Sequence, residues 1–214
     1  MYPSRPRSET LDNSSPELKG ELRRRLLEGV AEPRVLDLFC GNGEMYRRAY
    51  AGRVAEYVGV DREKVHDKRL CVIADNRAYV ASHDLARFNV FDLDAYGCPW
   101  ALLYRVLERA GPGPLVVFVT DGLVEHLRRM SAPTRLVSAT QRIPRGMDIP
   151  AQTRWYVAIF KTMLLDAGAR FGWTTTGGLY GYNVGKNVMY WGLQMERPPA
   201  PKRRPRSDNT TAAK

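Results

Sequence analysis

Short apolar segments alternate with helix-forming segments over most of this chain, and this alternation most strongly restricts the folds that it can adopt. Five segments are predicted to be strands: residues 35–39, 55–61, 69–75, 87–94 and 113–121. Residues 44–51 and 99–111, which lie between them, follow a helical pattern. Almost purely apolar strands that alternate with helices are typical of a parallel sheet covered on both faces. We therefore predict an α/β protein.

The C-terminal part follows a different pattern. Residues 151–167 predict an amphipathic helix, and two β-rich segments follow it, joined at residues 183–187. Two such segments on either side of a short turn that contains glycine predict an antiparallel hairpin. The predicted architecture is a mostly parallel, seven-stranded sheet that ends in an antiparallel C-terminal hairpin.

The length of 214 residues suits one well-buried domain. Residues 1–16 are rich in Ser, Pro and Arg and are predicted to be disordered, residues 17–196 to form the domain, and residues 197–214 to be a disordered basic tail. The first helix is predicted to have Ser15 as its N-cap and Pro16 at its first position. The three arginines at positions 23–25 are interpreted as its outer face.

The formal net charge of +10 is concentrated at the C-terminus. From Arg197 onward the chain holds six basic residues and one acid, which gives +5. A basic segment attracts polyanions by counterion release, so nucleic acid is the predicted partner. The alternative is a solubilising tail without a specific target.

Several protein classes are disfavoured by what the sequence lacks. No apolar run approaches the roughly 20 residues of a membrane helix, and residues 1–10 lack the apolar core of a signal peptide. Cys40, Cys71 and Cys98 are odd in number and widely spaced, which argues against a disulfide framework and a zinc site. We expect a cytoplasmic protein without a membrane segment or a metal ion, and its oligomeric state stays open.

Acidic residues stand at the carboxyl ends of three predicted strands. Asp61, Asp75 and Asp94 each end a strand, and a turn with Gly41 and Gly43 follows the first strand. Since ligands of open α/β sheets bind at this edge, near the point where the strand order reverses, we expect these groups to share one crevice. The alternative for each acid is that it only caps a neighbouring helix.

The residue types at this edge suit a nucleoside without a pyrophosphate. The glycine turn offers bare backbone but lacks the third glycine of a dinucleotide fingerprint. Asp61 can accept both ribose hydroxyls, Asp75 can accept an adenine amine, and the backbone amide of Asn76 can donate to a ring nitrogen. S-adenosylmethionine has these groups and is the predicted cofactor. The predicted cofactor-binding residues are Asp37, Phe39, Gly41, Gly43, Asp61, Arg62, Asp75, Asn76 and Asp94.

Four segments resemble successive motifs of class I S-adenosylmethionine-dependent methyltransferases. They are "VLDLFCGNGE", "YVGVDREKV", "IADNRAYV" and "VFDLDAYGCPW", and their order and spacing also fit the family. The resemblance covers residues 34–195 and includes the C-terminal hairpin. It implies a Rossmann-like methyltransferase fold, methyltransferase activity and S-adenosylmethionine as cofactor.

The stretch "FDLDAYGCPW" is similar to the Asp-Pro-Phe-Gly-Ser-Pro stretch of tRNA guanine-N2 dimethyltransferases. Asp94, Tyr96, Gly97 and Pro99 match that pattern, whereas Ala95 replaces a proline and Cys98 a serine. The resemblance implies that Asp94 and Tyr96 are catalytic and that Tyr96, Gly97 and Pro99 bind substrate.

The implied chemistry needs these residue types. An exocyclic base amine is a poor nucleophile because its lone pair is delocalised into the ring, so it must be held in line with the methyl group. Asp94 would accept an amine hydrogen bond and remove charge as the new bond forms. Tyr96 would stack on the base, worth about 1–3 kcal/mol. Asp92 shares the strand face of Asp94 and is either its partner or a buried structural carboxylate.

Residues 131–150 connect the fifth strand to the last helix and hold Arg142 and Arg145. We predict that these arginines bind substrate, either in a lid over the target base or in a loop that contacts phosphates. The alternative is a solvated connection without a role in binding.

The predicted function is therefore N-methylation of an exocyclic base amine in nucleic acid, with guanine N2 in RNA favoured over DNA. Ala95 leaves open a catalytically weak protein of this fold that binds nucleic acid, and an amine of DNA, protein or a small molecule is a further alternative. Methylation at C5 would need Cys98 as nucleophile, but Cys-Pro reverses the order in those enzymes. A metal-dependent O-methyltransferase would need a cluster of carboxylates, and only Asp121 and Glu125 follow the fifth strand.

Overall fold

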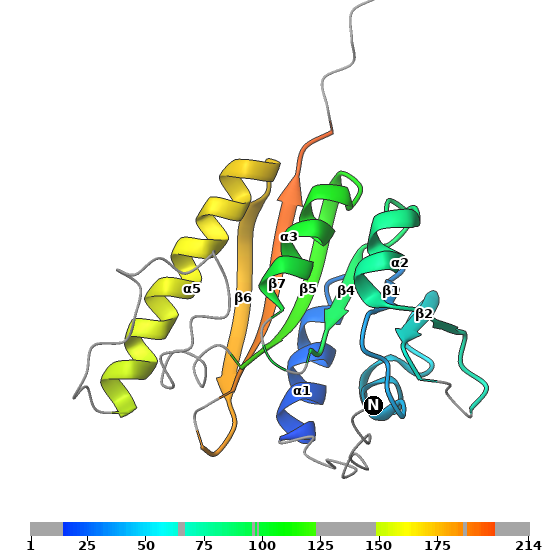
Figure 1. Cartoon of the computed structure of the whole chain (residues 1–214), viewed down its shortest axis with the longest axis horizontal. Coiled ribbons are helices and arrows are strands. Elements are labelled where there is room, and N and C mark those ends of the chain that lie inside the picture. The colour runs from blue at the N-terminus through cyan, green and yellow to red at the C-terminus, as the bar shows by residue number, and fades with distance from the viewer. Residues whose placement is uncertain are drawn as a thin grey trace, which may run out of the picture.

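A computed structural model describes residues 15–63, 67–95, 97, 99–122, 149–185 and 188–199, in which helices and strands alternate (Figure 1). The helices are α1 (Pro16–Leu27), the π-helix η1 (Tyr46–Tyr50), α2 (Asn76–Ser82), α3 (Trp100–Arg109) and α5 (Ile149–Phe171). The strands are β1 (Arg34–Asp37), β2 (Glu56–Asp61), β3 (Cys71–Ile73), β4 (Val90–Leu93), β5 (Gly113–Asp121), β6 (Thr174–Tyr182) and β7 (Met189–Arg197).

The strands form one seven-stranded sheet in the order β3-β2-β1-β4-β5-β7-β6. Strands β1 to β5 pair in parallel, and β7 runs antiparallel to both of its neighbours, β5 and β6. The predicted mostly parallel sheet with an antiparallel C-terminal hairpin is therefore confirmed. The strand order reverses between β1 and β4, which places the expected ligand crevice at their carboxyl ends.

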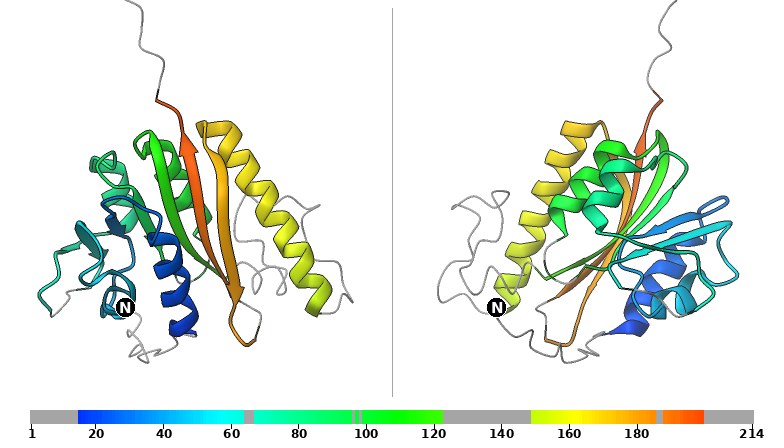
Figure 2. Two further views of the ribbon diagram at one scale, coloured as in Figure 1. Left: turned by 180° about the vertical axis from the view of Figure 1, so that it is seen from behind. Right: turned by 45° about the vertical axis from the view of Figure 1, so that its right-hand side comes forward.

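Helices cover both faces of this sheet (Figure 2). On one face α2, α3 and α5 bury a large apolar cluster that includes Phe91, Trp100 and Phe160. On the other face α1 and η1 bury a smaller cluster that includes Leu26 and Phe118. The central strand β5 is consequently buried on both sides, as its almost purely apolar sequence predicts.

Two local features depart from the sequence-based expectation near the N-terminus. Ser15 has a φ of 65° and its side chain makes no capping hydrogen bond, although Pro16 does open α1 as predicted. The helix predicted over residues 44–51 contains the π-helix η1, with a bond from the Ala51 amide to the Tyr46 carbonyl. The wider π turn places Tyr46 and Tyr50 against Tyr57, with ring centroids 4.6 and 5.9 Å away.

Arg197 belongs to the packed part of the chain, although its charge was counted with the tail. Its guanidinium lies 4.5 Å from the ring centroid of Trp173 and donates to the carbonyl oxygens of Leu107 and Ala110, near the end of α3. Burial lowers the pKa of this guanidinium. The basic residues after Pro199 are therefore five, with one acid, for a charge of +4.

Within the described ranges, no helix has the length and apolar character required to cross a membrane. Residues 1–14 and 200–214, for which disorder was predicted, lie outside those ranges.

Candidate cofactor and acceptor site

The carboxyl ends of the parallel strands meet at the lower edge of the sheet in Figure 1, and α1 begins at the same edge. The glycine turn follows β1, Asp61 ends β2, and Asp94 follows β4 directly. A parallel sheet therefore brings together groups that are far apart in the sequence, as expected.

The two glycines of the turn differ in their surroundings. Gly41 and Gly43 have φ values of +41° and +79°, a region that side chains strongly disfavour. A Cβ on Gly43 would lie 2.5 Å from Cζ of Arg69, so this glycine makes room for a guanidinium within the protein. A Cβ on Gly41 would have the Phe39 carbonyl oxygen as its nearest neighbour, 3.9 Å away. Of the two glycines, Gly41 is therefore the one with room beside its Cα, and its contact with a ligand stays a prediction.

Arg69 holds the turn from the side of β3. Its Nη2 donates to the Gly41 carbonyl at 2.9 Å, its Nη1 to the Cys40 carbonyl at 3.1 Å, and its Nε to Asp67 at 2.7 Å. Only 4% of its side chain is exposed. Sequence reasoning missed this residue, because 28 positions separate it from Gly41 and no motif links them.

Asp61 is bound to the same turn from the end of β2. One carboxylate oxygen accepts the Gly41 amide at 2.9 Å, and the other accepts the Glu63 amide at 3.1 Å. Each oxygen of a carboxylate can accept two hydrogen bonds, so both retain capacity for a further donor. This geometry suits the predicted acceptance of two ribose hydroxyls.

Asp75 has a structural role in this arrangement, as the N-cap of α2. Its Oδ1 accepts the amides of Arg77 and Ala78 at 2.9 and 3.1 Å, and its Oδ2 accepts two N–H groups of Arg62. Four donors match the capacity of a carboxylate, so an adenine amine at Asp75 would displace a donor such as the exposed Arg62, and the adenine contact stays a prediction. Hydrogen bonding to Arg62 holds the pKa of this carboxyl below its usual value.

Asn76 opens α2 beside this cap. Its buried side-chain oxygen has no hydrogen-bond partner among the residues that the structure describes. The predicted donor at this position was the Asn76 backbone amide, whose role toward an adenine ring stays a prediction.

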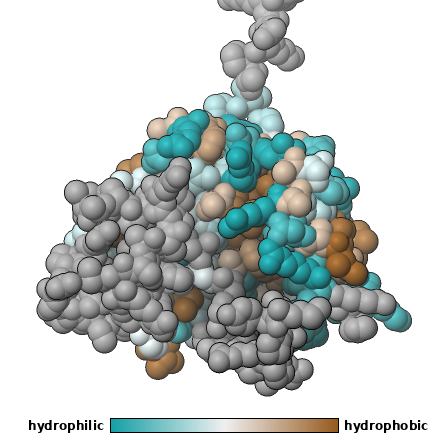
Figure 3. Space-filling model, in the orientation of Figure 1, coloured by the Kyte–Doolittle hydropathy of each residue, from teal (hydrophilic) through white to brown (hydrophobic). Residues whose placement is uncertain are grey.

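An exposed apolar side chain flanks Asp61 on β3. Ile73 pairs in register with Asp61 and is 60% exposed, and Leu70, just before β3, is 63% exposed. Figure 3 shows apolar atoms at the surface where β2 and β3 lie. Exposed apolar surface beside a hydroxyl acceptor suits the flat face of a purine, a signal that sequence reasoning did not use.

Asp37 lies beneath the glycine turn and is only 2% exposed. It accepts the Phe39 amide at 3.1 Å and the Tyr57 hydroxyl at 2.8 Å, so it fixes the backbone on which the turn is built. Burial, together with the nearby Asp92 carboxylate, raises the pKa of Asp37 to about 8. Phe39 is half-buried and packs against the larger apolar cluster.

Two ion pairs join α1 to β4, and we call them the ion-pair ladder: Lys19 with Asp94, and Arg23 with Asp92. Lys19 Nζ donates to the two oxygens of Asp94 at 2.7 and 3.0 Å, and Arg23 donates to the two oxygens of Asp92 at 2.6 and 2.7 Å. Four residues of a helix rise about 6 Å and two residues of a strand about 6.6 Å, so the spacings match.

The inner pair of the ladder, Arg23 with Asp92, resolves two questions that the sequence left open: the role of Asp92 and the side of α1 on which Arg23 lies. Asp92 is fully buried and also accepts the Tyr50 hydroxyl at 2.5 Å, so it is a structural carboxylate. Arg23 is 2% exposed, so its assignment to the outer face of α1 was wrong. Arg25, two positions on, does lie on the surface and pairs with Glu21.

The outer pair of the ladder, Lys19 with Asp94, places an anion at the edge of the sheet. The side chain of Asp94 is 14% exposed, and Arg23 lies 3.9 Å from it. Burial opposes its ionisation, but Lys19, Arg23 and a hydrogen bond from Thr120 outweigh burial and lower the pKa of Asp94. Lys19 itself lies 5.2 Å from the ring centroid of Tyr190.

The loop that follows Asp94 is tied to the end of β5. Gly97 has a φ of 105°, and its carbonyl accepts the Gly122 amide at 2.8 Å. Pro99 is the N-cap of α3, and its carbonyl accepts the Leu103 amide at 2.9 Å. Both residues therefore have backbone roles here. The other predicted residues of the acceptor site, Tyr96, Arg142 and Arg145, lie outside the described residues, as does Cys98.

Asp121, at the end of β5, is fully buried. It accepts hydrogen bonds from Trp100 Nε1, at 2.7 Å, and from the Tyr156 hydroxyl, so it joins β5 to α3 and α5. In the part of the chain that the structure describes, no three His, Cys, Asp or Glu side chains are grouped so that they could hold a metal ion.

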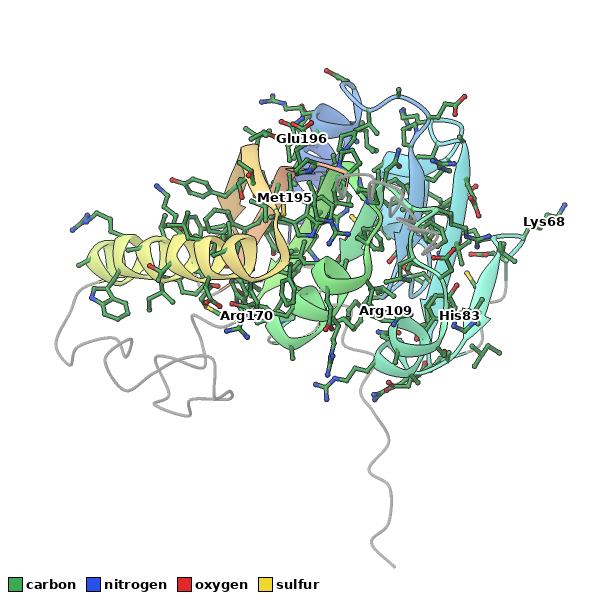
Figure 4. All side chains as sticks on the ribbon, turned by 90° about the horizontal axis from the view of Figure 1, so that it is seen from above. Lys68, His83, Arg109, Arg170, Met195 and Glu196 are labelled. Atoms are coloured by element: carbon green, nitrogen blue, oxygen red, sulfur yellow. The ribbon has the colours of Figure 1, made fainter. Side chains whose placement is uncertain are left out.

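Figure 4 shows the opposite edge of the sheet, where α2, α3 and α5 end near His83, Arg109 and Arg170. Cations at the carboxyl ends of helices are favourably placed in the helix dipole. Strand β7 also ends at this edge, because Arg197 pairs with Gly113 at the start of β5. The chain therefore leaves β7, before its C-terminal basic residues, at the edge of the sheet opposite Asp94.

Comparison with known proteins gives a fold. No protein-family model and no curated protein matches the chain. The proposed methyltransferase yhhF of Escherichia coli matches at 12% identity and a TM-score of 0.50, over 91% of this chain and 92% of that chain. M. jannaschii TYW2, solved in complex with AdoMet, matches at 13% and 0.51, over 84% and 76%.

A third solved structure, a proposed hemolysin of Lactococcus lactis, matches at 12% identity and a TM-score of 0.51, over 86% of this chain and 88% of that chain. At these identities the similarity is one of fold. Together with the strand order, it gives this chain the fold of class I S-adenosylmethionine-dependent methyltransferases, as the sequence motifs implied.

Proposed function

We propose that this chain is an S-adenosylmethionine-dependent methyltransferase that acts on an exocyclic base amine of nucleic acid, with guanine N2 in RNA as the acceptor. The observation that carries the proposal is the Asp94 carboxylate, paired with Lys19 directly after β4, on the sheet edge that also holds the glycine turn and Asp61. The choice of guanine N2 rests on the resemblance of residues 91–100 to the corresponding motif.

The residues of the edge fit the cofactor. Gly41 leaves open space above its backbone, Asp61 retains two lone pairs for ribose hydroxyls, and Ile73 offers an apolar surface for the adenine ring. S-adenosylmethionine supplies an electrophilic methyl group when it is bound. Arg69 and Asp37 support the turn from below and hold its backbone in place.

Asp94 would orient the acceptor amine. Its carboxylate has capacity for about four hydrogen bonds, of which Lys19 takes two and Thr120 one. The remaining capacity can accept one N–H of a base amine, which localises the nitrogen lone pair. As the nitrogen would bond to the methyl carbon, the sulfonium–carbon bond of the cofactor would break, and the Asp94 anion would stabilise the positive charge on the nitrogen until its proton is lost.

Nucleic acid as the substrate class rests on charge. The chain carries +10, and the five basic residues beyond Pro199 contribute much of the excess. Phosphates bound by such residues add affinity that is independent of sequence and falls with salt. The base would be recognised at the carboxyl edge, and the tail would add affinity from another part of the molecule.

A second function is favoured by one observation. Lys19 already occupies both oxygens of Asp94, as an acceptor amine would. A protein of this fold that binds nucleic acid without transferring methyl groups would keep such a pair as a purely structural one. Ala95, which stands where the related motif has proline, is consistent with this second function.

The test is transfer of a labelled methyl group. The purified full chain is incubated with S-adenosylmethionine that carries a trideuterated methyl group, and with total RNA or DNA, and the nucleosides are analysed by mass spectrometry. Labelled N2-methylguanosine from RNA is the expected product, and heat-denatured protein is the control. Labelled methyladenine from DNA would instead identify adenine in DNA as the acceptor, in place of guanine in RNA.

Binding separates the two functions when no label appears. If calorimetry shows S-adenosylmethionine binding, and the chain binds RNA or DNA but labels neither, the second function replaces the first. If the cofactor does not bind at millimolar concentration, the interpretation of the Gly41 turn and Asp61 fails.

A further inference from the structure

Lys19 lies on α1, outside every motif that the sequence shares with methyltransferases, yet it contacts the carboxylate that the proposed function relies on. It is 6% exposed, and 75 positions of sequence separate it from Asp94. A lysine is rarely buried to this extent without a paired charge, so the contact is a defined part of the fold.

We propose that Lys19 is a positioning residue of the acceptor site, which fixes the orientation of Asp94 and keeps it charged so that one lone pair stays available at the sheet edge. This inference rests on the proposed function for its consequence in methyl transfer. Its structural half, that Lys19 maintains the anion, stands on the geometry of the ion-pair ladder.

The orientation follows from the number of contacts. Two bonds from one ammonium, at 2.7 and 3.0 Å, set the plane of the carboxylate, and Thr120 approaches from β5. Arg23 lies 3.9 Å from Asp94 and is itself engaged by Asp92, so it cannot replace Lys19. Preorganised groups of this kind are effective because they need no rearrangement during the reaction.

The groups around Asp94 explain why its carboxyl group is negatively charged. Lys19 and Arg23 face it from α1, Thr120 from β5 and Asp92 from its own strand, while the Tyr190 ring of β7 lies near the Lys19 ammonium. The Asp92 carboxylate is paired with Arg23 and Tyr50. Lys19 is thus the cation that balances Asp94, and without it burial would favour the protonated carboxyl.

The test replaces Lys19 by methionine, which has a similar length and no charge, and by arginine, which restores the charge. Single-turnover methyl transfer is measured from pH 5 to 9 for wild type and both variants. For Lys19→Met we expect the acid limb to move to higher pH, so that the rate at pH 5.5 relative to pH 8 falls about tenfold or more, since ionisation falls tenfold per pH unit below a pKa. Lys19→Arg should restore the wild-type profile.

The experiment has one matched control variant and one substitute for the test variant. Lys161→Met removes an exposed lysine of α5 and should leave the profile unchanged. Lys19→Gln, which keeps a hydrogen-bond donor, replaces Lys19→Met if circular dichroism shows that the methionine variant is unfolded. A Lys19→Met protein that transfers methyl groups faster at every pH would identify Lys19 as a blocking side chain and overturn the proposal.

A second measurement does not depend on activity. The carboxyl carbon of Asp94 is titrated by NMR in protein labelled with carbon-13 at aspartate, with the signal assigned through Asp94→Asn. An upward shift of its titration in Lys19→Met, with recovery in Lys19→Arg, supports the proposal. A folded Lys19→Met protein in which Asp94 titrates as in wild type overturns it. If wild type transfers no methyl group, the proposed function fails, while this titration still decides whether Lys19 maintains the charge.

Discussion

At the scale of single residues, Asp37 and Asp94 share one sheet edge but differ in protonation. Burial and a neighbouring anion favour the neutral form of Asp37, whereas cations from α1 favour the charged form of Asp94. The different partners of these acids, rather than their type, therefore decide which of them can act on a substrate.

The clearest prediction at this scale concerns Asp94. Asp94→Asn keeps the size of the side chain but removes the anion, and methyl transfer should fall about 100-fold or more, as is typical for one well-placed electrostatic group. Binding of S-adenosylmethionine, measured by calorimetry, should change little. Asp61→Ala is the matched contrast, because it should weaken cofactor binding. A folded Asp94→Asn protein that retains the wild-type rate would rule out the proposed role of this carboxylate.

A second prediction concerns Asp37 and pH. Its pKa is about 8 in the folded protein and about 3.9 in an unfolded chain, so the folded state holds an extra proton between these values. The contribution of Asp37 to the free energy of unfolding is present in full below about pH 4 and is lost as the pH rises through about 8. Asp37→Asn cannot ionise, so its unfolding free energy relative to wild type should increase from pH 5 to pH 8.

Urea unfolding at several pH values measures this difference. Asp84→Asn, at an exposed carboxyl, reports the effect of removing a surface charge. Parallel pH dependence of wild type and Asp37→Asn would contradict the raised pKa of Asp37.

At the scale of elements, α1 is held to the sheet by charge as well as by apolar packing. Leu22 and Leu26 lie in the apolar cluster of that face, and the ion-pair ladder joins the same helix to β4. A Cβ on Gly192 of β7 would lie 2.3 Å from a methyl group of Leu26, so glycine allows the helix to approach closely.

Loss of the inner ion pair should weaken this docking. Arg23→Met leaves Asp92 buried without its cation, and the unfolding free energy should fall by about 3–5 kcal/mol. The double variant Arg23→Met/Asp92→Asn should recover most of this loss, because no uncompensated charge remains. Chemical unfolding measures both. Arg25→Met, on the exposed side of α1, should cost well under about 1 kcal/mol, and an equal cost for Arg23→Met would contradict a structural role of the pair.

The strands and the hairpin could be predicted from the sequence, because short apolar runs and turn residues are local signals. Asp61 and the Gly41 turn were found for the same reason, since each follows a predicted strand. The ladder was not found, because a basic residue on a helix is usually solvated and nothing local indicates a partner 69 to 75 positions away. For Asp75 the structure shows the helix-capping role, whereas the contact with adenine stays a prediction.

At the scale of the whole molecule, the two edges of the sheet have different properties. The carboxyl edge holds the candidate cofactor and acceptor residues, and the opposite edge holds Arg109, Arg170 and the end of β7 (Figure 4).

The basic tail should contribute affinity rather than chemistry. In a variant with the five basic residues beyond Pro199 replaced by glutamine, S-adenosylmethionine binding should be unchanged. The slope of log affinity for single-stranded RNA against log salt should decrease in magnitude by up to about 3.5, at about 0.7 per neutralised phosphate. Fluorescence anisotropy between 50 and 200 mM salt measures the slope. An unchanged slope would assign the tail to solubility alone.

The place of β7 between β5 and β6 has a consequence for synthesis on the ribosome. Strand β5 is made well before the strand that pairs with its outer edge, since Val117 pairs with Leu193, 76 positions later in the sequence. Until β7 emerges, an apolar strand that ends up buried on both faces presents an unpaired edge, which is a hazard for aggregation. The nascent chain therefore cannot complete its sheet stepwise from the N-terminus, and stalling before residue 189 would leave its most apolar strand open to other chains.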